Sequence, residues 1–339
     1  MSSPGGDPAR GDLACDLDLL VLGEVNPDVI VSAPGLEVRF GQVEQVVDRA
    51  AFVLGGSGAI VAMGAARLGL RAGLCAVVGQ DDLGALMVGS LVERGVDVEH
   101  MGSVSGVATG LTVVLDRGGD RAVLTAPGAI AQLSPGDLDA LPDRPARHVH
   151  VASYYLMSPL YRAALPNALR RFREAGVTTS LDTNWDPHET WDLGDVLAHT
   201  DVFLPNENEL TAVAGTPLVD RAMGVLAGLG CDVVVKRGKH GGAARVGGRG
   251  YRLTRTPPVE FVDAVGAGDT FDAGWLAGRL TGRDPATSLT MAVVAGTLST
   301  AAPGGTTAQP ELSEVEPWLR TLRPVEADYA GEADAEDPW

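Results

Sequence analysis

The sequence predicts an α/β fold in which helices cover both faces of a mostly parallel central sheet. Short apolar runs of β type alternate with helical runs along most of the chain, which is the pattern of strands joined by crossover helices. Two segments break this alternation and look antiparallel, so they are expected to lie apart from the main sheet. At 339 residues the chain can form one large domain or two modest ones.

The expected elements follow from the spacing of apolar residues. The predicted strands are residues 19–22, 73–78, 148–152, 177–181, 201–204 and 233–235, and the predicted helices are residues 59–68, 83–94, 160–175, 207–214 and 271–280. The two segments outside the alternation are residues 29–53 and about 107–126. The second contains a hairpin-like Leu-Thr-Val-Val-Leu run before Arg117-Gly118.

Composition excludes several classes of function. The net charge of −18 argues against a nucleic-acid or anionic-membrane partner, because both require a basic face. No apolar run approaches the length of a membrane span, and the N-terminus lacks the pattern of a secretory signal. Three cysteines (Cys15, Cys75 and Cys231) without metal-type spacing indicate reduced thiols and a cytoplasmic location. Residues 1–15 and the acidic residues 324–339 are predicted to be disordered, leaving one domain over residues 16–323.

The most informative motif is the glycine-rich turn Gly266-Ala267-Gly268-Asp269 before the predicted helix at 271–280. Glycines leave backbone N–H groups uncovered, and the N-terminus of a helix attracts anions, so this turn could hold a phosphate. Asp269 would then be the group able to take a proton from an attacking hydroxyl. The alternative is structural, with Asp269 only a helix N-cap and the glycines only a tight turn.

Two other nucleotide motifs fit poorly. A P-loop needs a lysine at a fixed place in its glycine frame, and neither Lys236 nor Lys239 stands there. A dinucleotide fingerprint would need a third glycine after Gly56 and Gly58, and the chain has Val61 at that position. Hydride transfer is therefore the weak alternative.

The turn resembles the C-terminal signature of the ribokinase (PfkB) family of small-molecule kinases, and further segments resemble other landmarks of that family in the same order. These are Gly23-Glu24-Val25-Asn26-Pro27-Asp28, Gly55-Gly56-Ser57-Gly58-Ala59, Val78-Gly79-Gln80-Asp81-Asp82-Leu83-Gly84, Asp182-Thr183-Asn184, Asn206-Glu207-Asn208-Glu209, and Lys236-Arg237-Gly238 with Gly241. The resemblance runs from about residue 19 to about residue 310. It implies a ribokinase-like fold in which the two exceptional segments form a small β-sheet lid over the acceptor.

The resemblance also implies an activity and a set of site residues. The activity is transfer of the γ-phosphoryl group of ATP to a hydroxyl of a sugar or sugar-like acceptor. Asp269 is then the catalytic base, with Gly266, Ala267 and Gly268 as the anion hole. The nucleotide is expected near Asn184, Asn206, Lys236, Gly238 and Gly241, Mg²⁺ near Glu209 with Asn206, and a monovalent cation such as K⁺ near Asp263. The acceptor is expected near Asn26, Asp28, Gly55, Gly56, Ser57, Ile60 and Met157.

The sequence leaves the identity of the acceptor open. An amide and a carboxylate at Asn26 and Asp28 suit vicinal hydroxyls, which favours a sugar. Ile60 and Met157 stand where ribokinase-type members carry polar residues, which argues against ribose. Tyr154 and Tyr155 could stack on a ring, so a nucleoside kinase is the first alternative, and an inactive binding protein of the same fold is the second. A homodimer formed through the lid is a further expectation.

Overall fold

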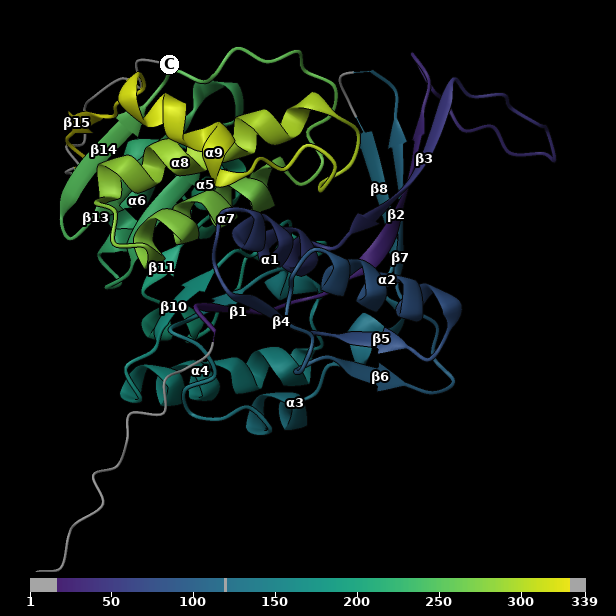
Figure 1. Cartoon of the computed structure of the whole chain (residues 1–339), viewed down its shortest axis with the longest axis horizontal. Helices are drawn as coiled ribbons and strands as arrows, with labels where there is room; N and C mark the ends of the chain where they lie inside the picture. The colour runs from purple at the N-terminus through teal and green to yellow at the C-terminus, as the bar shows by residue number, and fades with distance from the viewer. Residues whose placement is uncertain (1–16, 119–120, 330–339) are drawn as a thin grey trace, which may run out of the picture.

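The computed structural model describes residues 17–118 and 121–329, and its centre is a nine-stranded sheet (Figure 1). Across the sheet, the strands are β15 (Val325–Ala327), β14 (Arg249–Leu253), β13 (Gly242–Val246), β12 (Asp232–Lys236), β11 (Val202–Phe203), β10 (Thr178–Leu181), β9 (His148–Val151), β1 (Leu19–Leu22) and β4 (Ala72–Cys75). The six strands from β12 to β4 are parallel, whereas β13, β14 and β15 continue the sheet antiparallel. The predicted mostly parallel sheet is confirmed.

Helices cover both faces of this sheet and bury one apolar cluster on each side. One cluster receives side chains from α1 (Ser57–Arg67), α2 (Asp82–Glu93), α7 (Ala267–Leu280), α8 (Pro285–Leu298) and α9 (Leu312–Val315). The other receives them from α3 (Pro135–Asp139), α4 (Pro159–Glu174), α5 (Glu207–Ala214) and α6 (Val219–Ala227). Because the parallel strands are buried on both faces, they read as continuous apolar runs in the sequence.

Helices α7 and α8 approach each other unusually closely. A Cβ atom on Gly274 would lie 2.8 Å from Cα of Ala292, and one on Gly278 would lie 2.8 Å from Cα of Ser288. Larger residues at these positions would push the helices apart, which explains the small residues in this apolar helix. The close contact fixes α7, whose N-terminus carries the glycine-rich turn.

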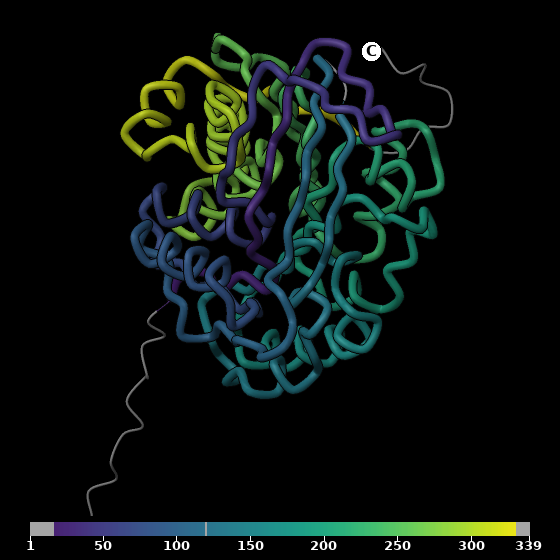
Figure 2. Tube along the Cα trace, turned by 90° about the vertical axis from the view of Figure 1, so that its right-hand side faces the viewer, coloured from purple at the N-terminus to yellow at the C-terminus, as the bar shows by residue number. Residues whose placement is uncertain are grey.

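The lid is a separate four-stranded sheet in the order β3 (Arg49–Gly55), β2 (Asn26–Ser32), β7 (Leu111–Asp116) and β8 (Arg121–Ala126). Figure 2 shows its purple and blue strands side by side. The prediction needs three corrections. The two central strands β2 and β7 are parallel, and the lid begins at Asn26, directly after β1, because β2 follows without a crossover helix. Residues 33–48, expected within the lid, form an irregular and mostly exposed segment, which stays beside β7 only at its start, where Ala33 N–H donates to Asp116 O at 3.1 Å.

The base of the lid is held by a carboxylate. Asp81, the N-cap of α2, accepts hydrogen bonds from the backbone N–H of Gly84 at 2.8 Å and of Thr109 at 2.8 Å, and from Thr109 Oγ1 at 2.6 Å. Thr109 lies two residues before β7. One side chain therefore caps a helix of the main domain and fixes the point at which the lid leaves it.

Two further predictions are corrected by the structure. The expected strand at 73–78 divides at Ala76, because its second half, β5 (Val77–Gly79), pairs instead with β6 (Gly102–Val104) in a small separate sheet. The segment from residue 324, predicted to be disordered, contributes β15 to the edge of the main sheet. Its acidity is matched there by arginines of β14: Arg249 Nη2 lies 2.6 Å from Glu326 Oε1. Residues 1–15 and 330–339 lie outside the described residues.

Two other observations concern the described part of the chain. None of its helices combines the length and the apolar character needed to cross a membrane. Cys75 and Cys231 are buried free thiols, while Cys15 lies outside the described residues.

Replacing Asp81 by Ala should lower the free energy of unfolding by about 2–3 kcal/mol, because it removes an N-cap and two hydrogen bonds to the base of the lid. Asp284 is a matched control: it caps α8 through the N–H of Thr287 at 3.0 Å and has no bond to the lid. Asp284→Ala should cost about 1 kcal/mol. Urea unfolding measures both, and equal losses would show that the contact with Thr109 adds nothing to stability.

Candidate active site

The predicted site residues gather at the carboxyl edge of the parallel strands, where α/β folds place their ligands. The N-termini of α1, α5 and α7 meet there. Asn184, after β10, bonds Ser57 at the start of α1, while Asn206, at the start of α5, forms a backbone bridge with Lys236 at the end of β12. Lys236 in turn lies beside Gly268 in the first turn of α7, with its Cδ 3.4 Å from the place a Cβ would occupy.

The glycine-rich turn forms the N-terminus of α7. Gly266 is the N-cap and adopts a left-handed conformation with φ 69°, and its Cα packs so closely on Gly305 that a Cβ would overlap it. The first N–H groups of a helix are not used by its own hydrogen-bond ladder, so this turn presents donors toward the strand edge. One of the three predicted donors is partly occupied, since Ala267 N–H donates to Ala264 O at 3.3 Å.

Asp269 lies in this first turn and is 8% exposed. Burial raises its pKa to about 7, and the neighbouring charge of Asp182 acts in the same direction. The charge of Lys236 and a hydrogen bond from Ser57 oppose this rise. A carboxyl group with a pKa near neutrality is suited to accept a proton during a reaction and to release it afterwards.

Lys236 carries the positive charge at the centre of this cluster. Its Nζ lies 2.6 Å from Asp182 Oδ2 and 3.0 Å from Asp272 Oδ2. Asp182 follows directly after β10, and Asp272 lies on α7, one helical turn after Asp269. Sequence reasoning placed Lys236 near the phosphates and treated Asp182 as a possible strand-end acid. It missed Asp272, which reads there as an ordinary polar residue of a helix.

Glu209 and Asn206, the predicted metal pair, form a capping box at the start of α5. Glu209 accepts from Asn206 N at 2.8 Å and from Asn206 Nδ2 at 2.6 Å. Burial raises the pKa of Glu209 to about 7, assisted by the charge of Asp182. Within the described residues, no three His, Cys, Asp or Glu side chains are grouped to enclose a metal ion. Mg²⁺ in phosphoryl-transfer sites needs only one or two carboxylates, so the residues present fit a site completed by phosphates and water.

Asp263, the other predicted cation ligand, joins two loops. Its Oδ1 accepts from Val265 N at 2.9 Å and its Oδ2 from Gly304 N at 2.9 Å. Both oxygens therefore hold backbone groups beside the glycine turn.

Asn26 and Asp28 lie on β2, next to the lid strand β7, and both are buried. Asn26 Nδ2 donates to Asp28 Oδ1 at 2.9 Å and to Thr112 Oγ1 at 3.1 Å. The carboxyl group of Asp28 occupies the space above Gly55, where any Cβ would overlap it. Burial raises the pKa of Asp28 to about 7, and the charge of Asp269 acts in the same direction.

A hydrogen-bonded network that sequence reasoning did not find joins this region to β9 and β10. Glu24 accepts from Ser57 N at 2.8 Å and from Ser153 Oγ at 2.6 Å, and Asn184 Nδ2 donates to Ser57 Oγ at 2.6 Å and to Ser153 Oγ at 2.8 Å. The backbone beside this network is closely packed: Gly56 has φ 87°, and a Cβ there would lie 2.9 Å from the backbone carbonyl oxygen of Glu24. Ser153 and Asn184 both have left-handed backbone conformations, the strained type that often marks functional sites.

The remaining predicted residues have packing or turn positions. Ile60 is 3% exposed, and its Cδ1 comes within 3.1 Å of the place a Cβ of Gly266 would occupy, so it supports the glycine turn. Met157 is 4% exposed and packs in the apolar cluster on the α4 face. Gly238 and Gly241 form the tight turn between β12 and β13, both with positive φ.

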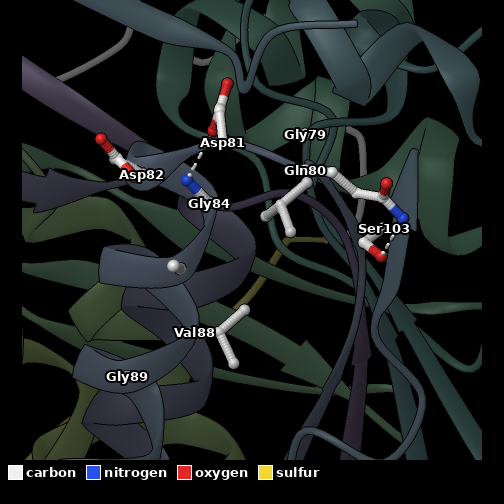
Figure 3. A pocket seen from close by; sticks show the side chains of 10 residues that line it. Gly79, Gln80, Asp81, Asp82, Gly84, Val88, Gly89 and Ser103 are labelled. Atoms are coloured by element: carbon white, nitrogen blue, oxygen red, sulfur yellow. Dashed lines mark hydrogen bonds between the residues drawn. The ribbon is translucent and has the colours of Figure 1, made fainter. Parts of the chain in front are cut away.

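A surface pocket of about 720 Å³ lies elsewhere, between the β5–β6 sheet and the first turns of α2 (Figure 3). Asp81, the residue that holds the base of the lid, lines it, and Gln80 Nε2 donates to Ser103 Oγ at 3.3 Å across it. It contains none of the predicted site residues.

Comparison with known proteins shows the family of the chain. The chain matches the family model described as pfkB family carbohydrate kinase over residues 16–312. It is 33% identical to an ATP-dependent ribose-1-phosphate kinase of Halopiger xanaduensis, over 86% of this chain and 94% of that protein. It is 33% identical to a fructokinase of Klebsiella pneumoniae, over 77% of this chain and 90% of that protein.

The fold is also shared with a solved structure. The ribokinase of Arabidopsis thaliana, complexed with ribose and ATP, superposes with a TM-score of 0.78 at 25% identity, covering 90% of this chain and 99% of that one. The chain belongs to the pfkB family of carbohydrate kinases, and it is an ATP-dependent phosphotransferase.

Proposed function

We propose that this kinase phosphorylates a hydroxyl group of a sugar-like acceptor, with Asp269 as general base and the turn at 266–268 as anion hole. The observation that carries the proposal is the position of Asp269. It is a buried carboxyl group with its pKa raised to about 7, in the first turn of a helix whose N-terminus has no side-chain cap. A base and an anion site a few ångströms apart are what an in-line phosphoryl transfer requires.

In the proposed step, the carboxylate of Asp269 accepts the proton of the acceptor hydroxyl. At the same time the oxygen of that hydroxyl bonds to the γ-phosphorus of ATP. The bond from that phosphorus to the β–γ bridging oxygen breaks, and its electron pair leaves with ADP. Charge on the transferring group would be stabilised by the N–H groups of the turn and by the partial positive charge of the α7 N-terminus.

Mg²⁺ would be held near Asn206 and Glu209, where it would neutralise charge on the phosphates. Glu209 supports this role because it is a buried carboxyl group, next in space to Lys236 and Asp182, and is already oriented by the capping box. A monovalent cation near Asp263 is a further part of the proposal. Rates in potassium and sodium chloride at equal ionic strength test it.

The acceptor proposed is a polyol, because Asn26 and Asp28 present an amide and a carboxylate side by side beneath the lid. When the acceptor covers this carboxylate, hydroxyl groups of the acceptor must replace the water that it loses. Substrates that lack the matching hydroxyls would therefore be rejected. The names of the two relatives suggest ribose 1-phosphate and fructose as first acceptors to try.

A nucleoside acceptor is a second candidate, and Trp185 favours it. Tyr154 and Tyr155 are buried and pack edge to face, so they belong to the core rather than to a ring-binding surface. Trp185, next to Asn184, is 51% exposed and rests against Trp191, which leaves an aromatic surface beside the site. Trp185→Ala should then weaken nucleosides more than simple sugars in kcat/KM.

A homodimer formed through the lid is proposed as well. The lid and its irregular segment expose large apolar side chains, among them Phe40 at 93% and Val46 at 94%, which is unusual on a monomer surface. Sedimentation velocity over a range of concentrations tests this proposal, and a monomer at every concentration would reject it.

The activity is tested by measuring ADP release with Mg²⁺ and ATP across ribose, fructose, ribose 1-phosphate, sugar acids and nucleosides. Asp269→Asn should keep the fold and ATP binding but lower kcat at least ~10²-fold, the usual scale for a positioned base.

In the native enzyme, kcat/KM should fall as the pH drops below about 7, because only the ionised form of Asp269 accepts the proton. Near-native turnover by Asp269→Asn would remove this residue from the mechanism.

Glu209→Gln should raise the Mg²⁺ concentration required for half-maximal rate more than it raises the Michaelis constant of the acceptor, because an amide is a weaker ligand than a carboxylate. Glu207→Gln is the control, since Glu207 lies on the same helix and pairs with Arg237. Kinetics over a magnesium series distinguish the two variants. A larger effect on the acceptor than on Mg²⁺ would place Glu209 away from the metal.

Asp28→Ala should lower kcat/KM for the acceptor by about 10²-fold, since charge-assisted hydrogen bonds to hydroxyls are lost, and should leave the Michaelis constant for ATP nearly unchanged. Gly55→Ala should have the same selective effect, because its Cβ would displace the Asp28 carboxyl group. Initial rates with each substrate varied in turn provide the comparison. If ATP and the acceptor weaken equally, the acceptor does not bind at Asp28.

A further inference from the structure

Lys236 makes contacts with two carboxyl groups that the proposed chemistry does not explain. Its side chain is 11% exposed, and its ammonium group contacts two carboxyl groups at once, Asp182 at 2.6 Å and Asp272 at 3.0 Å. The side chains of these two residues are 2% and 0% exposed. The end of β12, the residue after β10 and helix α7 are thus joined at one nitrogen atom.

The position of Asp272 connects this contact to the reaction. Asp272 and Asp269 are three residues apart on α7, so their side chains lie on the same face of the helix, one turn from each other. The stem of Lys236 passes beside Gly268, the last residue of the anion-hole turn. Whatever holds Asp272 therefore also holds the first turn of α7, with its base and its N–H donors.

The charges agree with an anchoring role. Burial opposes ionisation of Asp182, but the charge of Lys236 together with hydrogen bonds from Lys236, Asp272 and the backbone of Asn184 outweighs it and lowers the pKa of Asp182. Burial raises the pKa of Asp272 well above its ordinary value, which favours its neutral form. Lys236 Nζ donates a hydrogen bond to Oδ2 of this carboxyl group at 3.0 Å. The pair Lys236–Asp182 is then balanced in charge, and Asp272 serves as a hydrogen-bond acceptor that fixes α7 to it.

We propose that Lys236 and Asp272 are positioning residues for phosphoryl transfer: Lys236, held by Asp182 directly after β10, anchors Asp272 and thereby sets the place of Asp269 and of the anion-hole turn. The proposal rests on the proposed role of Asp269. It assigns no direct contact with substrate to either residue. It differs from a purely structural role because a shift of the first turn of α7 would misplace the reacting groups even in a folded protein.

The decisive comparison is between two substitutions at one position. Asp272→Asn keeps an acceptor oxygen for Lys236 and should retain near-native kcat. Asp272→Leu removes it while leaving the balanced pair Lys236–Asp182 in place, so the protein should still fold. We expect the kcat of Asp272→Leu to fall by about 10–100-fold, because a displacement of the reacting groups by up to about one ångström has an effect of this size. The Michaelis constant for ATP should change little.

Lys236→Met gives an independent readout. The charge of Lys236 lowers the pKa of Asp269, so its removal should move the acidic limb of kcat/KM to higher pH, in addition to lowering kcat. Arg252→Met is the control. It breaks a partly buried ion pair with Asp220 between β14 and α6, and should lower stability without moving the pH profile.

The outcomes distinguish failure of the proposed base from failure of the positioning role. If Asp269→Asn turns over normally, the proposed base fails, and the positioning role fails with it. If Asp269 is required but Asp272→Leu, shown to be folded by circular dichroism and urea unfolding, matches Asp272→Asn in kcat, only the positioning role is overturned. A loss in Asp272→Leu that Asp272→Asn restores supports it.

Discussion

The collection of carboxyl groups at the strand edge depends on a single buried ammonium group. Asp182, Glu209, Asp269 and Asp272 all interact electrostatically with Lys236. Desolvation alone would make so many buried carboxyl groups costly, because each ionised group loses its hydration. Lys236 keeps Asp182 ionised, while Glu209 and Asp269 are left with pKa values near 7. The structure thus holds groups that can change protonation state near neutral pH without a large change in the surrounding fold.

The acceptor side is built on a different principle, close approach of backbone and side chain. Asp28 fits only because Gly55 has no side chain, whereas Gly56, with its positive φ, leaves room for the backbone of Glu24 and Val25. Glycine is therefore required at positions 55 and 56 for two different physical reasons. Each position leaves room for a different polar group, one on the lid strand β2 and one before it.

Much of the fold could be predicted from the sequence because its signals are local. The helices at 207–214 and 271–280, and the strand at 19–22, follow from apolar spacing and end where the structure ends them. The orientation of β2 and β7 could not be predicted, since parallel pairing between distant segments leaves no local pattern. The acidic segment from 324 was assigned by composition, and its folding depends on backbone pairing of β15 with β14, some 75 residues away.

The site shows the same division. The glycine-rich turn and Asp269 are contiguous, so their chemistry could be proposed from the residues themselves. The contact of Lys236 with Asp182 and Asp272 joins three distant segments, and Asp272 alone carries no signal beyond that of a polar residue in an apolar helix. Ile60 and Met157, expected at the acceptor from the resemblance, are buried against the glycine turn and in the core, which only tertiary packing decides.

The last described strand has a practical consequence for anyone who shortens this chain. β15 covers the backbone of β14 along residues 250–252, and Tyr329 closes over it by donating a hydrogen bond from its hydroxyl to Tyr251 O at 3.0 Å. A truncation before Val325, which the acidic composition might invite, would leave β14 as an open sheet edge with unpaired N–H and C=O groups. Such an edge is a template for intermolecular pairing, so the shortened protein would be prone to aggregate.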